Sequence, residues 1–356
     1  MHMLGLVLVP LVLGTAAYSL WPSRISWKEL LLITGIGCLV CAGGFQICKW
    51  GSMRDVEHWN GRITSKDHGS QGCCHCRSVC DSRDKDGNCT SSHEECAHPH
   101  DYWWSLSVST GDSISVDSCE PWESNVPKAW TNAIIGEPAA VAHHFQNYLK
   151  ADPYSLVNKV ADPAMLETVP PFPAIHDLYK VSKVVSAGIV LPPEWNRELL
   201  EINADLGASN QVDVTMIVTD KTDPIWADAL EAKWLYGPKN SVNIVIGVKD
   251  GKFNWVRVVT LSRVEDLKIA LRDGLQGLRT DEWEKGLGVI RNAISTKFVR
   301  TPMAEWEYLA SAATPPTWVL VLLYVMAIGL SCGLIWWAHE QDIFGDKWKQ
   351  RFKRRN

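Results

Sequence analysis

Residues 4–20 read LGLVLVPLVLGTAAYSL and residues 30–48 read LLLITGIGCLVCAGGFQIC, with no charged residue in either stretch. A helix that crosses a bilayer needs about 20 predominantly apolar residues, and about 17 is the lower limit. Because only a short link separates the two stretches, we expect an antiparallel transmembrane hairpin over residues 1–48. The four glycines of the second stretch favour close packing of the two helices in lipid.

A third uncharged stretch, residues 318–338, predicts a C-terminal transmembrane helix. It has Trp318 at one end and Trp336 and Trp337 at the other, and aromatic rings prefer the membrane interface. The chain then ends in a basic tail, residues 339–356. The tail side chains expected at the membrane surface are Lys347, Lys349, Arg351, Lys353, Arg354 and Arg355.

The positions of the basic residues predict the orientation. Lys and Arg close to a span favour the cytoplasmic side, and they occur both in the tail and in the short link, at Arg24 and Lys28. We therefore expect an integral protein of a bacterial inner membrane, with residues 50–316 on the non-cytoplasmic side and the C-terminus in the cytoplasm. A cleaved signal peptide ending near Ala16 and Ala17 is the alternative for the first stretch, although it lacks the positive start of such peptides.

A cysteine-rich stretch, QGCCHCRSVCDSRDKDGNCTSSHEECAHPHDYWW, occupies residues 71–104. Seven of the eleven cysteines lie between residues 73 and 119, which predicts either disulfides or a metal site. The non-cytoplasmic location favours disulfides, and the odd number leaves one thiol free or paired between chains. Zinc stays open as the alternative, because thiolates and imidazoles at short spacing suit it. The candidate disulfide or zinc residues are Cys73, Cys74, Cys76, Cys80, Cys89, Cys96 and Cys119, with His75, His93, His98 and His100 as further ligand types.

The sequence DKDGN at residues 84–88 is similar to the start of a calcium-binding loop. Ser82 and His93, however, stand where that loop needs acidic ligands. A tight turn is the favoured interpretation and a calcium ion the alternative.

The predicted fold class is a membrane-anchored α+β protein with three transmembrane helices and two soluble units. Residues 50–120 form a small cysteine-rich β unit, in which Thr110–Asp112 turns a hairpin. Residues 121–184 are a connecting segment, with a short helix over Val141 to Lys150 and an extended proline-rich stretch at 163–173.

Residues 185–305 show the order β-α-β-α-β-β-α-α, which predicts a mixed sheet covered by helices. The segments GIVLPPEWNRELLEINADLGASNQVDVTMIVTD (residues 188–220) and NSVNIVIGVKDG (residues 240–251) resemble the TPM domain family. The resemblance implies divalent-metal binding and phosphatase-like activity in some members. Asp220, Asp223 and Asp250 are the acids that could act as metal ligands here, although Asp223 is equally a helix cap. The segments HWNGRIT, DYWW and IGEPAAVAHHFQNYLKA further resemble uncharacterised membrane proteins of tailed bacteriophages.

The net charge of -5 gives no basic field and argues against nucleic acid as a partner. No nucleotide-binding, zinc-protease or serine-hydrolase motif is present. We therefore expect an anchored extracytoplasmic binding or scaffolding protein, with the lipid bilayer and an envelope protein as partners. The alternatives are a metal-dependent hydrolase and a zinc-binding ectodomain.

Overall fold

The computed structural model describes residues 2–152, 154, 155, 157 and 159–341, and its chain divides into two compact units. The first unit comprises residues 1–54, 146–158 and 303–356, and the second comprises residues 55–145 and 159–302. The fold class predicted from the sequence is confirmed, since long apolar helices, a disulfide-bonded β unit and a mixed sheet are all present.

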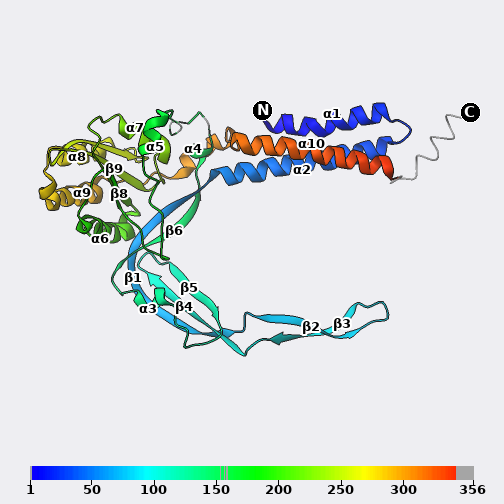
Figure 1. The fold of residues 1–356 in the computed structure, drawn as a ribbon, viewed down its shortest axis with the longest axis horizontal. Coiled ribbons are helices and arrows are strands. Elements are labelled where there is room, and N and C mark those ends of the chain that lie inside the picture. Colours follow the sequence, from blue (N-terminus) through cyan, green and yellow to red (C-terminus); the bar gives the residue numbers. More distant parts are fainter. Residues whose placement is uncertain (1, 153, 156, 158, 342–356) are drawn as a thin grey trace, which may run out of the picture. The chain divides into compact units, whose positions relative to one another are not determined.

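Three helices in the first unit are long and apolar enough to cross a membrane. They are α1 (His2–Leu20), α2 (Trp27–Met53) and α10 (Thr317–Glu340). They run side by side (Figure 1) and share a cluster that contains Leu6, Phe45 and Leu320. Ser26 caps α2, and the buried carboxylate of Glu29 accepts the Ser26 backbone N–H at 2.7 Å, so the start of the helix is satisfied without water.

Close helix contact in this unit depends on small residues, as the sequence predicts. A Cβ added to Gly37 would lie 2.5 Å from the Cβ of Pro10, and one added to Gly14 would lie 2.8 Å from a methyl group of Thr34. Both distances are too short for real side chains. Gly35 and Gly43 have open space at that position, so only part of the glycine pattern is used for packing.

The second unit contains a four-stranded sheet in the order β5-β4-β1-β6. Strand β1 pairs antiparallel with β4, and β4 pairs antiparallel with β5. Ile63, Leu106 and Val108 form the core of its buried face. The elements are β1 (Arg54–Gly72), β4 (His100–Val108), β5 (Ser113–Glu120), α3 (Lys128–Asn132) and β6 (Pro138–Gln146).

The predicted helix over Val141 to Lys150 is wrong. Residues 138–146 form β6, and only Tyr148–Ala151 is helical, as α4. Strand β6 takes its place at the edge of the sheet beside β1, and the N–H of Ala140 donates to the carbonyl of Tyr179 at 2.9 Å. Tertiary pairing overrides the helical pattern of this short segment. The extended stretch predicted at 163–173 also begins with a short helix, α5 (Pro163–Thr168), capped by Asp162.

The same unit holds a mixed sheet in the order β10-β9-β8-β7, with β7, β8 and β9 parallel and β10 antiparallel. Helices cover both faces, so β8 and β9 are almost continuously buried. Helices α6, α8 and α9 pack on one face, while α5 and α7 pack on the other. The elements are β7 (Val184–Ala187), α6 (Pro193–Asn210), β8 (Asp213–Thr219), α7 (Trp226–Trp234), β9 (Ser241–Lys249), β10 (Lys252–Thr260), α8 (Glu265–Leu275) and α9 (Trp283–Lys297).

Candidate functional site: the disulfide-bonded hairpin and its base

A two-stranded hairpin, β2 (Cys76–Arg83) and β3 (Cys89–Cys96), extends beyond β1 and β4 (Figure 1). Every residue of β3 is exposed, and β2 buries none of its residues. Two disulfides, Cys76–Cys96 and Cys80–Cys89, join the two strands. A ribbon without an apolar core is only marginally stable in water, so these covalent bonds hold the hairpin in shape.

The turn of this hairpin confirms the preferred interpretation of residues 84–88. Gly87 has a positive φ of 86° and its N–H donates to the carbonyl of Asp84 at 3.1 Å. The Asp84 carboxylate accepts the backbone N–H groups of Asp86 and Asn88. The Asn88 N–H is the main reason why the pKa of Asp84 lies below its usual value. This carboxylate therefore serves the turn itself.

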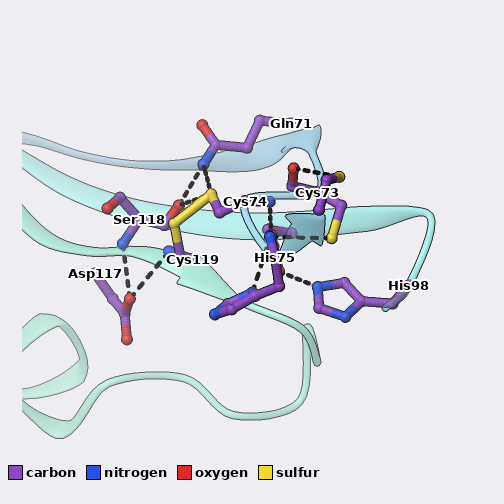
Figure 2. The surroundings of a disulfide bond; sticks show 10 residues. Gln71, Cys73, Cys74, His75, His98, Asp117, Ser118 and Cys119 are labelled. Carbon is purple, nitrogen blue, oxygen red and sulfur yellow. Dashed lines mark hydrogen bonds and ion pairs between the residues drawn. A yellow bond between two sulfur atoms is a disulfide. The ribbon is translucent and has the colours of Figure 1, made fainter. Parts of the chain in front are cut away.

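A third disulfide, Cys74–Cys119, ties the segment that follows β1 to the end of β5 (Figure 2). It closes a loop across 45 positions of sequence. Beside it, the side chain of Gln71 donates to the carbonyl of Ser118 (Figure 2). The disulfide interpretation is thus confirmed for six of the seven clustered cysteines.

The seventh cysteine, Cys73, is unpaired in the described range 2–152. It lies at the base of the hairpin, which we define as residues 73–75 and 97–101. The last pair of the β1–β4 ladder is Gly72 with His100, and the first pair of β2–β3 is Cys76 with Cys96. Between those ladders the two segments leave regular pairing, apart from the Ala97 N–H, which donates to the carbonyl of His75 at 3.3 Å.

Four side chains converge at the hairpin base. One potential ligand atom each from Cys73, His75, His98 and Asp101 lies within 4.8 Å of the others. The two imidazole rings have centroids 5.5 Å apart (Figure 2). Their exposure differs, because the side chain of His75 is 55% exposed and that of His98 is 20% exposed.

Asp101 is the most buried member, with a side chain that is 0% exposed. Its Oδ1 contacts Nε2 of His98, its Oδ2 accepts the N–H of Cys74, and Nδ1 of His75 lies 3.7 Å from Oδ2. Burial acts to raise the pKa of Asp101, but the Cys74 N–H and the His98 imidazole outweigh it and lower the pKa. The carboxylate is therefore held as an anion facing two imidazoles.

A second cluster of charges is buried where β1 meets the mixed sheet. Lys183 and Asp213 form an ion pair with both side chains 0% exposed. The ammonium of Lys183 also donates to Nδ1 of His58 at 3.1 Å, and Asn60 donates to Oδ1 of Asp213 at 2.9 Å. Sequence reasoning missed this cluster, because its members are far apart along the chain. It joins the two sheets of the second unit.

The three acids suggested by the TPM resemblance lie at turns beside the mixed sheet. Asp220 follows β8, Asp250 lies in the turn from β9 to β10, and Asp223 precedes α7, where its carboxylate accepts the N–H of Ile225 at 2.9 Å. Among described residues, the groups that could hold a metal do not include them. The hydrolase alternative therefore stays a prediction. The basic side chains from Lys347 to Arg355 lie outside the described residues.

No family model matches this chain. Curated proteins and solved structures also give no match. The resemblances to the TPM family and to phage membrane proteins therefore gain no support from known proteins, and the function must be argued from the residues themselves.

Proposed function

We propose that this chain is a membrane-anchored protein of the bacterial envelope, which binds a partner protein on the non-cytoplasmic side through the β2–β3 hairpin. The observation that carries the proposal is the hairpin itself, a ribbon that is exposed on both faces and stapled by two disulfides.

The disulfides support the location. Disulfides form and persist outside the reducing cytosol, and three of them occur in one segment of this chain. The basic residues Arg24, between α1 and α2, and Lys28, in the first turn of α2, agree with the same orientation. If α1, α2 and α10, the three candidate spans among the described residues, each cross the bilayer, the region between α2 and α10 lies on one side of it.

The composition of the hairpin indicates what kind of surface it binds. Val79 is the only aliphatic residue between Cys76 and Cys96, whereas acidic and basic side chains are interspersed. Such a ribbon is unsuited to insertion in lipid and suited to polar contacts with a protein. Because the disulfides fix its shape before binding, little conformational entropy is lost when a partner docks.

Site-specific photo-crosslinking in intact cells tests this proposal. A photoreactive residue at the exposed Ser92 of β3 should give one discrete adduct with an envelope protein. The same residue at the exposed Asp266 of α8 is the matched control and should give none. A double variant, Cys80→Ser with Cys89→Ser, should lower the yield of the adduct because the end of the hairpin loses its disulfide. Equal adducts from both positions, or none from Ser78, Ser92 and Glu94, would contradict the proposal.

A further inference from the structure

The side chains that converge at the hairpin base have no role in the proposed binding function. Pairing six of the seven clustered cysteines leaves Cys73 beside two imidazoles and a buried carboxylate. A buried carboxylate is costly unless cations or hydrogen bonds compensate it. Here Asp101 accepts the backbone N–H of Cys74 and faces the imidazoles of His75 and His98, which are common ligands of zinc.

The four ligand atoms come from two segments that run in opposite directions. Cys73 and His75 lie on the segment between β1 and β2, whereas His98 lies on the segment that returns from β3 to β4 and Asp101 is the second residue of β4. Disulfide Cys76–Cys96 joins the first pair of the β2–β3 ladder, next to this group, and Cys74, between Cys73 and His75, is bonded to Cys119 at the end of β5. These two covalent bonds restrict the movement of the segments, which preorganises the group.

The donor set selects the metal. A thiolate and two imidazoles suit zinc and are poor ligands for calcium or magnesium, which prefer oxygen. Four donors from Cys, His and Asp match the usual four-coordinate zinc environment. Ligand atoms within 4.8 Å of one another need only a small contraction to surround one ion.

We propose that Cys73, His75, His98 and Asp101 bind one zinc ion, which cross-links the two segments at the base of the hairpin. On binding, the Cys73 thiol gives up its proton to solvent and the zinc ion takes its place. The ion also replaces the hydrogen bond between His98 and Asp101. This assignment differs from a zinc site built from the clustered cysteines in general, because six of those cysteines are consumed by disulfides.

Metal titration of the full-length chain in detergent tests the assignment. After treatment with a chelator, the protein should bind one equivalent of Co²⁺, with a thiolate-to-metal charge-transfer band in the near ultraviolet, and Zn²⁺ should displace it. Cys73→Ser and His98→Gln should each lower the zinc affinity by at least about 100-fold, because loss of even an outer partner costs about 10- to 100-fold.

The matched control is His93→Gln, which removes an exposed histidine of β3 that pairs with Asp81; it should bind zinc like the parent chain. Disulfide mapping of each variant must show the three native pairs, which separates ligand loss from misfolding. The assignment is overturned if Co²⁺ gives no charge-transfer band. It is equally overturned if Cys73→Ser, with native pairs, binds zinc unchanged, or if Cys73 of freshly isolated protein is itself in a disulfide.

Discussion

At the scale of single residues, the least replaceable side chains of the soluble unit are the buried ions Lys183 and Asp213. Lys183 directly precedes β7 and Asp213 is the first residue of β8, and both side chains are fully buried. Nδ1 of His58 in β1 accepts from Lys183, and Asn60 of β1 donates to Asp213. The cluster therefore couples the β5-β4-β1-β6 sheet to the mixed sheet, and removal of one ion leaves the other buried without its counter-ion.

Replacement of Lys183 by methionine should lower the free energy of unfolding by about 3 to 5 kcal/mol, as expected when one member of a buried ion pair is removed. Urea unfolding of the full-length protein in detergent, followed by tryptophan fluorescence, measures the change. The double variant Lys183→Met with Asp213→Leu is the control and should recover much of the loss. A single variant as stable as the parent would contradict the account.

Acid should destabilise the soluble unit through Asp213. Burial alone would raise the pKa of this carboxyl, but the charge of Lys183 and the bond to His58 lower it well below its usual range. The unfolded chain therefore takes up this proton first, near pH 4. The stabilisation is fully present above about pH 5, begins to decrease near the unfolded pKa of about 4, and is lost only as the pH falls through the much lower pKa of the folded state. The urea midpoint measured over that window should fall less steeply in the double variant without the pair.

At the scale of elements, the hairpin depends on its sulfur bonds rather than on a core. Loss of Cys80–Cys89 in a double serine variant should fray the end of the hairpin, while Cys76–Cys96 keeps its start in register. Hydrogen–deuterium exchange should therefore rise in residues 80–92 and stay unchanged in β4. A disulfide of this kind contributes about 2 to 4 kcal/mol. Unchanged exchange throughout the hairpin would show that the bond is dispensable.

Metal removal should expose the hairpin base to thiol–disulfide exchange. The sulfur of Cys73 lies within 4.8 Å of the sulfurs of Cys76 and Cys96. Its thiolate can attack either one, form a new disulfide and release the other cysteine as a thiolate. A bound zinc ion holds the Cys73 thiolate as a ligand and prevents this attack. Chelator-treated protein at mildly alkaline pH should therefore form Cys73–Cys76 or Cys73–Cys96, and zinc-loaded protein should not. Mass mapping after acid quenching measures both, and equal exchange rates would contradict protection by zinc.

The elements differ in how far the sequence predicts them. The periodicity of residues 185–305 predicts the mixed sheet, because long helices and buried strands carry strong local patterns. The cysteine cluster predicts disulfides but not their pairing, which depends on strand register. Strand β6 was missed because its pairing beside β1 is a contact between distant segments. The part of Asp101 in the hairpin base was missed for the same reason, although the spacing Cys-x-His and His-x-x-Asp on facing segments is a usable signal.

At the scale of the whole molecule, the apolar helices and the oxidised cysteines point to the same location. Three helices are apolar enough to cross a bilayer, and the segment between α2 and α10 carries three disulfides. A protein that is anchored in the membrane and carries its disulfide-bonded unit outside the cytoplasm accounts for both observations. A cytoplasmic location would reduce the hairpin, and its strands would then lack both a core and covalent bonds.

Disulfide mapping in intact cells tests this most directly. Cells expressing the full-length chain are quenched in acid and their free thiols are alkylated before lysis, so the thiol state in the cell is preserved. The account predicts the pairs Cys74–Cys119, Cys76–Cys96 and Cys80–Cys89, with Cys73 alkylated. Recovery of all seven cysteines between residues 73 and 119 as alkylated thiols would place the hairpin in a reducing compartment and contradict the account.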